Sequence, residues 1–184
     1  CKQFTENVHE VPTAVDLSKF KEKAKEPKHK FTVGWQGTST SFKYLKNIED
    51  ELKEFFLTHS NCELHVSSDR YPKELTELHE YIEFKKWNKE DEVSHIQEFD
   101  VGIMPIEQDE YSLGKCSYKM LLYLSCGVPA CVTSWGMNKE ILKKGKVGIG
   151  VEGENKWNET LDYFYKNRFN LDEIFPDCRK VVKD

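Results

Sequence analysis

The sequence predicts an α/β fold: a three-layer, Rossmann-like open parallel sheet with helices on both faces. Two observations predict it. Short apolar runs bounded by glycine or proline alternate with stretches whose apolar residues recur every three or four positions. Strands that alternate with helices favour βαβ units with right-handed crossovers, and therefore parallel strands. The 184 residues allow one domain of this kind and leave no room for two large ones.

The first half of the chain predicts three strands, each followed by a helix. An apolar run over 31–34 ends in a glycine-rich turn, and apolar residues then recur at helical spacing over 42–56. The further expected elements are a strand over 62–66, a short helix over 72–80 that begins at a proline, a strand over 81–84 and a helix over 90–99.

The second half continues this alternation. Its expected elements are a strand over 100–105, a polar loop over 107–116, a helix over 118–126, strands over 130–133 and 147–151, and helices over 138–144, 157–166 and 171–182. Ser117 is the expected N-cap of the almost uniformly apolar 118–126 helix, which is typical of a buried helix. Ligands of open parallel sheets bind beyond the carboxyl ends of the strands. The loops at that edge follow Gly34, Val66, Phe84, Pro105 and Thr133.

Composition and charge exclude several classes of protein. The 27 basic and 32 acidic residues give a net charge of −5, which excludes a general nucleic-acid binder. No run approaches the roughly 20 apolar residues that span a bilayer, and no secretory signal opens the sequence. The chain starts at Cys1 without a methionine, and we expect it to be a piece of a longer protein. The charged run over 19–30 is interpreted as a solvated linker.

The six cysteines favour buried thiols over a metal site. There is no C-x-x-C pair, and the nearest metal-like pattern joins Cys62 to His65. That pattern lies in an expected strand, where residues three apart point to opposite faces. Cys126 and Cys131 flank Gly-Val-Pro among apolar residues, as small buried side chains do in a reducing compartment. We therefore expect a cytoplasmic protein.

The loop after the first strand is a candidate anion site. Gly37 and Thr38 open a run of hydroxyl residues before the next helix, which together offer backbone N–H groups and a helix N-terminus. The pattern is neither a dinucleotide fingerprint nor a P-loop. A turn that uses glycine merely to change direction is an equally good interpretation.

The loop before the 118–126 helix is more specific. Lys115 and Lys119 lie on either side of the Ser117 cap. A cation at a helix N-terminus opposes the helix dipole, so two lysines there are unfavourable unless an anion binds between them. The pattern predicts a bound phosphate. The alternative is that both lysines extend into solvent.

Four sequence segments together resemble one enzyme family. They are Glu98–Ile106, Gly114–Lys119, Tyr123–Pro129 and Gly136–Ile141, and their order and spacing are similar to those of the C-terminal domain of GT-B "group 1" retaining glycosyltransferases (glycosyltransferase family 4-like). Val11–Asp16 resembles the linker that enters this domain. The resemblance covers nearly all residues from Val11 onward.

This resemblance implies that residues 1–30 form an interdomain linker and that residues 31–184 form a Rossmann-like domain that binds a nucleotide sugar. The partner would be an N-terminal acceptor-binding domain absent from this chain. Family members transfer a sugar from a nucleotide diphosphate sugar to an acceptor hydroxyl with retention, without a metal ion or other cofactor. The implied role is polysaccharide or glycolipid biosynthesis in the cytoplasm, at the inner face of the membrane through the missing domain. The isolated fragment would be inactive.

The resemblance also implies site residues. Those expected at the donor diphosphate are Gly37, Thr38, Lys115, Ser117, Tyr118 and Lys119. Those expected at the base or the sugar are Phe84, Glu110, Gly136, Met137 and Asn138. No catalytic residue can be assigned. Trp35 and Trp87 are expected on ligand-side loops, so that their fluorescence should respond to a donor.

The sequence departs from the family pattern at four positions. Trp35 and Thr40 stand where many members have an arginine and a lysine in the first loop. Gly114 and Leu122 stand where the family's E-x7-E motif has glutamates, the second of which accepts hydrogen bonds from the ribose. These departures leave a degenerate, non-catalytic scaffold as one alternative. A doubly wound binding module of the receiver or flavodoxin type is another, although a receiver needs an acidic cluster that residues 34–40 lack.

Overall fold

The structure, a computed structural model, describes residues 5–7, 9, 13–22, 30–153 and 156–183. Its strands are β1 (Phe31–Gln36), β2 (Cys62–Ser68), β3 (Ile82–Lys86), β4 (Val101–Met104), β5 (Ala130–Thr133) and β6 (Gly148–Val151). Its helices are the 3-10 turn η1 (Ser39–Ser41), α1 (Phe42–Lys46), α2 (Glu49–Thr58), α3 (Glu92–Gln97), α4 (Glu110–Leu113), α5 (Tyr118–Ser125), α6 (Gly136–Leu142), α7 (Trp157–Lys166), α8 (Leu171–Ile174) and α9 (Cys178–Lys183).

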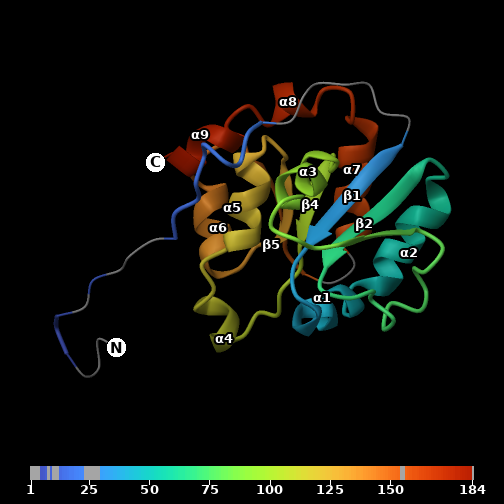
Figure 1. The fold of residues 1–184 in the computed structure, drawn as a ribbon, viewed down its shortest axis with the longest axis horizontal. Coiled ribbons are helices and arrows are strands. Elements are labelled where there is room, and N and C mark those ends of the chain that lie inside the picture. The colour runs from blue at the N-terminus through green and yellow to red at the C-terminus, as the bar shows by residue number, and fades with distance from the viewer. Residues whose placement is uncertain (1–4, 8, 10–12, 23–29, 154–155, 184) are drawn as a thin grey trace.

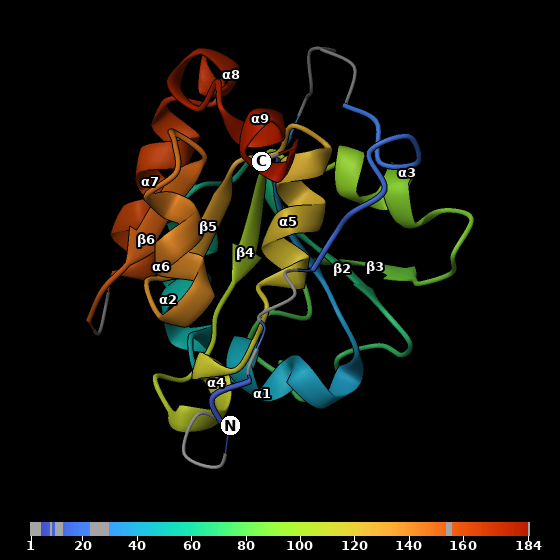
Figure 2. The ribbon, with the colours of Figure 1, turned by 90° about the vertical axis from the view of Figure 1, so that its left-hand side faces the viewer.

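The described strands form one open parallel sheet in the order β3-β2-β1-β4-β5-β6. This confirms the predicted fold class. The strand order reverses between β1 and β4, because β2 and β3 extend the sheet to one side and β4 to β6 extend it to the other. In such sheets the reversal opens a crevice at the carboxyl edge. Both α1 and α4 lie at the lower end of the molecule in Figures 1 and 2, where β1 ends.

Helices cover both faces of the sheet. In Figure 1, α5 and α9 stand to the left of the central strands and α2 stands to the right. Two glycines let the layer that contains α3 and α5 approach the sheet closely. A Cβ on Gly34 would lie 1.9 Å from the Phe99 ring, and a Cβ on Gly102 would lie 2.3 Å from the Tyr123 ring. The aromatic rings therefore occupy the space that strand side chains would fill.

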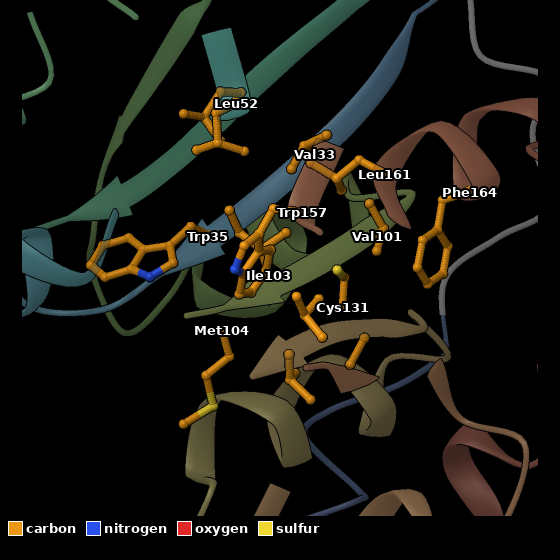
Figure 3. Close-up of a cluster of buried hydrophobic side chains, with 14 of the residues drawn as sticks. Val33, Trp35, Leu52, Val101, Ile103, Met104, Cys131, Trp157, Leu161 and Phe164 are labelled. Carbon is orange, nitrogen blue, oxygen red and sulfur yellow. The ribbon is translucent and has the colours of Figure 1, made fainter. Parts of the chain in front are cut away.

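The main core lies between the sheet and the α2–α7 layer. Figure 3 shows strand residues such as Val33, Ile103 and Cys131 beside the helix residues Leu161 and Phe164. Each of these five is fully buried or nearly so. Burying an aliphatic or aromatic side chain of this size stabilises a fold by about 1.5–3 kcal/mol. The core thus holds the strand ends that carry the site.

The helix predicted over 72–80 is wrong. The segment forms successive turns, with the amides of Leu75, Leu78 and Tyr81 each bonded three residues back. Leu75 and Leu78 are fully buried, and the Glu77 amide donates to the buried Glu49 carboxylate of α2 at 3.1 Å. A long-range carboxylate therefore takes a donor that a helix would have used.

Three other elements differ from prediction. The helix expected over 42–56 is divided into α1 and α2. The loop expected over 107–116 contains α4, because the Asp109 side chain accepts from the Ser112 amide at 2.8 Å and caps a single turn. The helix expected over 171–182 is divided into α8 and α9 by Pro176, which restricts the preceding residue to a non-helical conformation.

The segment over 13–22 packs against the domain. Phe20 is buried with Ile96 and Phe99, and the Arg179 guanidinium of α9 donates to the carbonyls of Leu17 and Phe20. Of the charged run over 19–30, which was expected to be solvated, Lys19 instead forms an ion pair inside the fold. Residues 23–29, and the first two residues of the proposed linker motif 11–16, lie outside the described residues.

Candidate functional site

A cavity of about 300 Å³ opens at the carboxyl edge of the sheet. Its wall comes from the ends of β1, β2 and β3 and from the first turns of α3 and α5. The lining residues are Gln36, Gly37, Thr38, Asp69, Trp87, Glu92, Tyr118, Lys119 and Leu122. The cavity therefore lies beside the β1–β4 reversal, where the topology predicts a ligand.

Gly37 supplies space rather than a free donor. A Cβ at this position would lie 2.6 Å from Cε and 2.7 Å from Nζ of Lys119, and 2.9 Å from the Trp35 ring. The Gly37 amide donates to the Ser67 carbonyl at 3.1 Å. The glycine thus lets the Lys119 ammonium lie against the backbone at the end of β1.

The hydroxyl run after Gly37 is bonded within the protein. Thr38 lines the cavity, and its hydroxyl lies 2.8 Å from that of Thr40. Both the amide and the hydroxyl of Ser39 donate to the Asp69 carboxylate, at 2.6 and 2.8 Å. These bonds lower the pKa of Asp69 and keep it ionised. A carboxylate of the protein therefore occupies donors that the sequence assigned to an external anion.

Lys119 is the cation of the cavity. Its ammonium lies 4.5 Å from the centre of the Trp35 ring, a cation–π contact. Burial, assisted by the charge of Lys115, lowers the pKa of Lys119 to about 8. Among the described residues, no carboxylate forms an ion pair with it. A cation in the first turn of α5 also opposes the helix dipole, so a bound anion would remove two unfavourable interactions.

Ser117 and Tyr118 shape the start of α5. Ser117 is buried and adopts a left-handed backbone with φ 55°, and within the described chain its side chain forms no capping bond. The predicted capping role is therefore wrong, because a residue in this conformation bends the chain into the helix instead. That bend brings Tyr118 and Lys119 into the cavity wall. Partial burial and the nearby Glu92 carboxylate raise the pKa of Tyr118, so it stays neutral.

Lys115 lies outside the cavity wall. Its ammonium donates to the Tyr44 hydroxyl at 2.7 Å and lies over the Tyr44 and Tyr111 rings, at 4.0 and 5.2 Å from their centres. It still lies close enough to Lys119 to lower the pKa of that ammonium. The two lysines are thus neighbours in the structure, but Lys119 faces the cavity and Lys115 binds two aromatic rings.

The residues expected at the base or the sugar lie outside the cavity wall. Phe84 is on the edge strand β3 and packs against Tyr71, with ring centres 5.6 Å apart. Glu110 is exposed in α4. Gly136 has φ +53° and lies against the α4 backbone, and a Cβ on it would be 3.4 Å from the Leu113 Cα. Met137 packs on the core, and the buried Asn138 amide donates to the Thr133 carbonyl at 3.0 Å.

Four cavity residues were outside the predicted site: Gln36, Asp69, Glu92 and Leu122. Sequence reasoning had no signal for Glu92, a helix residue that resembles any first-turn acid. Trp87 was placed on a ligand-side loop and does line the cavity. Trp35 was expected in a loop but lies in β1 and is buried under Lys119.

Cys62, Cys116, Cys126 and Cys131 are free thiols in the described chain, and the Cys178 thiol donates to the Phe175 carbonyl at 3.2 Å. Cys62, Cys126, Cys131 and Cys178 are buried and Cys116 is exposed. Burial raises the pKa of Cys62 and of Cys126 to about 12. No group of three His, Cys, Asp or Glu side chains gathers into a metal-binding arrangement among the described residues. In the same residues, no helix has the length and apolar character that crossing a membrane requires.

Residues 31–167 match the family described as "Glycosyl transferases group 1". The chain belongs to this family. The match covers every strand of the sheet and the whole cavity wall. No curated protein sequence matches the chain.

Solved structures of group 1 glycosyltransferases share the fold. The C-terminal domain of a glycosyl transferase group 1 family protein (LpcC) from Francisella tularensis is 15% identical with a TM-score of 0.68, and the match covers 92% of this chain and 97% of that one. A TarM crystal structure is 15% identical with a TM-score of 0.69, covering 96% and 36%. A TarM mutant from S. aureus in complex with Fondaparinux, alpha-GlcNAc-glycerol and UDP is 12% identical with a TM-score of 0.75, covering 98% and 37%. The chain therefore spans little more than a third of the TarM chain.

Proposed function

We propose that this chain is the donor-binding part of a retaining glycosyltransferase, and that its cavity binds a nucleotide diphosphate sugar. The observation that carries the proposal is Lys119: a desolvated ammonium in the cavity wall, with no carboxylate partner in the described chain. A diphosphate is the complementary ligand. The bound UDP of the S. aureus TarM complex supports this class of ligand.

In this proposal the protein acts on the leaving group. A departing nucleoside diphosphate gains negative charge as the bond to the sugar breaks, and a fixed cation in a partly desolvated site stabilises that charge. Lys119 would supply the cation beside Gly37 and Thr38, with Tyr118 next to it. Such stabilisation needs no metal ion or other cofactor. The general base for the acceptor hydroxyl would come from outside this chain.

The rest of the assignment follows the family pattern. Residues 31–184 would form the donor domain and residues 1–30 the linker from an N-terminal acceptor-binding domain. Lys115 and Ser117 would support the diphosphate site from behind its wall. The sugar would extend toward the ends of β4 and β5, where Glu110, Gly136 and Asn138 lie. A cytoplasmic enzyme of polysaccharide or glycolipid synthesis, held at the membrane by the other domain, fits this proposal.

Nucleotide titration tests the proposal. Thermal-shift and tryptophan-fluorescence titrations with UDP, GDP, ADP and CMP should show saturable binding of one nucleoside diphosphate, because a ligand of the native state raises its melting temperature. Trp87 lines the cavity and Trp35 lies under the Lys119 ammonium, so the fluorescence of both should report binding. Lys119→Ala should weaken the binding. Absence of binding to all four nucleotides in both titrations would contradict the proposal.

A second candidate is a non-catalytic scaffold with the same fold. Leu122 favours it, because this buried apolar side chain lines the cavity where the family pattern has a glutamate. The Asp69 carboxylate beside Thr38 favours it too, since it repels a phosphate. A scaffold predicts no nucleotide binding even after the N-terminal domain is restored, whereas the enzyme predicts transfer by the two-domain protein.

A further inference from the structure

Glu92 places a buried carboxylate in the cavity wall. The residue is 9% exposed and begins α3. Its Oε1 accepts from the Gln36 amide nitrogen at 3.2 Å and from the Trp87 indole N–H at 3.4 Å, and its Oε2 accepts from the Lys19 ammonium at 2.8 Å. A carboxylate has about four acceptor sites. Three donors of the described chain therefore leave one of these acceptor sites open. The bond from the indole is also long, and so it is weak.

Charge divides the cavity wall into two parts. Lys119 beside Gly37 forms a cationic part, next to which the Asp69 carboxylate is held by Ser39. Glu92 forms an anionic part beside the Trp87 indole, which is 43% exposed. A phosphate would be attracted to the first part and repelled by the second. The portion of a ligand that reaches Glu92 must therefore carry no negative charge and must donate hydrogen bonds, as the hydroxyls of a sugar do. Gln36 also calls for a hydrogen-bond donor on the ligand, since its buried Oε1 has no hydrogen-bond partner among the described residues.

The geometry points to Glu92 as the residue that selects ribonucleotides, by accepting hydrogen bonds from the ribose hydroxyls of the donor. We rest this on the proposed function, which puts the diphosphate at Lys119. A ribose carries two adjacent hydroxyls, and both can donate to Oε2, which in the described chain accepts only from Lys19 and has two acceptor sites once that ammonium leaves. The base would then lie toward the exposed Trp87 ring, on which a flat heterocycle can stack.

Lys19 is the group that the ribose replaces. Its side chain is 35% exposed, against 12% for the Glu92 side chain, so the ammonium can leave for solvent while the carboxylate stays. A pair with one partly exposed member is weakly held. The backbone around Lys19 is fixed independently, through Phe20 in the apolar cluster and through Arg179. Exchange of Lys19 for a ribose therefore needs movement of one side chain.

The test compares ribonucleotides with their deoxy counterparts. Dissociation constants of the chain for UDP, GDP and ADP are measured beside those for the 2′-deoxy and 3′-deoxy forms, by calorimetric titration. We expect the deoxy forms of the bound nucleotide to bind about tenfold more weakly, the loss typical of a hydrogen bond to a charged acceptor. Glu92→Gln keeps one acceptor oxygen but removes the charge, so it should reduce this ratio to about threefold or less. The matched control Glu90→Gln, at an exposed position of the preceding loop, should retain it.

Each outcome decides a separate claim. Nucleotide binding that depends on Lys119 but is equal for ribose and deoxyribose would overturn the role of Glu92 and leave the proposed function intact. Absence of binding to UDP, GDP and ADP would contradict the proposed function. If Glu92→Gln fails to fold, Lys19→Met replaces it: freeing the carboxylate should retain or widen the ratio, and a ratio of one would overturn the inference. Discrimination that is undiminished in folded Glu92→Gln would overturn it too.

Discussion

The two sides of the β1–β4 reversal use their polar residues differently. On the side where β1, β2 and β3 end, charged groups of opposite sign line a cavity, and Lys119 there has no carboxylate partner in the described chain. On the side where β4 and β5 end, polar groups bond to the fold itself. Thr133 bonds to the Ile106 amide at 3.0 Å, Asn138 bonds to the Thr133 carbonyl, and Asp109 caps α4.

This difference distinguishes polar residues that are available to a ligand from polar residues that stabilise the fold. Charge that is desolvated without a partner reduces stability and has to be offset by a ligand or by the rest of the fold. Hydrogen bonds within the chain stabilise the connections on which such a site rests. The sequence patterns on the two sides are alike, with glycine, hydroxyl and charged residues in both. The cation without a carboxylate partner in the described chain lies on the β1–β3 side, and this is why we propose the diphosphate site there.

The largest expected effect comes from filling the space at Gly37. Gly37→Val would place methyl groups against Lys119 and Trp35, since a Cβ alone would lie 2.6 Å from Lys119 Cε. Relief of this overpacking displaces the Lys119 ammonium from the cavity wall and fills the space beside Gly37, so nucleotide affinity should fall by more than about tenfold. The matched control is Gly114→Val on the other side, where a Cβ would meet its nearest neighbour at 3.5 Å. Equal losses in titrations of the two variants would remove the distinction between the sides.

Substitution of the two lysines should have different effects on nucleotide affinity. Lys119→Met removes the cavity ammonium, and affinity for a nucleoside diphosphate should fall about tenfold. Lys115→Met removes an ammonium that already bonds to Tyr44, and affinity should change by less than about threefold. Calorimetric titration of both variants measures this. A larger loss for Lys115 would move the anion site to the α4 side.

Nucleotide affinity should depend on pH through Lys119. Because the pKa of Lys119 is lowered to about 8, the ammonium is charged below pH 8 and increasingly neutral above it. Affinity should be constant from pH 7 to about 8 and then decline, by up to about tenfold per pH unit. The nucleotide itself contributes little here, since its phosphate titrates near pH 6. Lys119→Met should remove the decline, and a decline that persists in this variant would assign it to another group.

The same titration affects stability. The folded state lowers the pKa of Lys119 from the ordinary 10.5 to about 8, so between these pH values the unfolded chain binds more protons. The free energy of unfolding should therefore increase as pH rises through this window, because the unfolded chain binds more protons than the folded one there. Below the window, Lys119 should make the free energy of unfolding neither rise nor fall with pH. Urea titrations of the protein and of Lys119→Met at pH 7.5 and 9.5 isolate the contribution as a difference. The same pH dependence in both proteins would contradict the assignment.

Local patterns predicted the fold well because most strands contain a short run of apolar residues and alternate with helical spacing, even where charged residues interrupt the run, as in β3. The parallel sheet followed from the βαβ alternation, and the expectation of a ligand at its carboxyl edge followed from the parallel sheet, whereas the order of the strands came from the structure. The failures are long-range. The segment over 72–80 has a helical pattern, but Glu49 of α2 takes one of its amides. Ser117 has the chemistry of a cap but bends the chain instead.

The site was predictable in part. Gly37, Thr38, Tyr118 and Lys119 come together at the cavity, since two of them end a strand and two begin a helix. Lys115 resembles Lys119 in sequence, and only the position of the Tyr44 ring separates them. Glu92 reaches the cavity from a helix that gives no local signal, because what distinguishes it is the donors that surround it.

Direct titration of Lys119 tests the central claim. Nuclear magnetic resonance of the lysine side chains, with Lys119 assigned through its Met variant, gives the pKa of this ammonium with and without a nucleoside diphosphate. We predict a pKa of about 8 in the free protein and a clear rise on binding UDP, GDP or ADP, because a bound diphosphate stabilises the charged form. A pKa at the ordinary value that stays unchanged with every nucleotide would contradict the account.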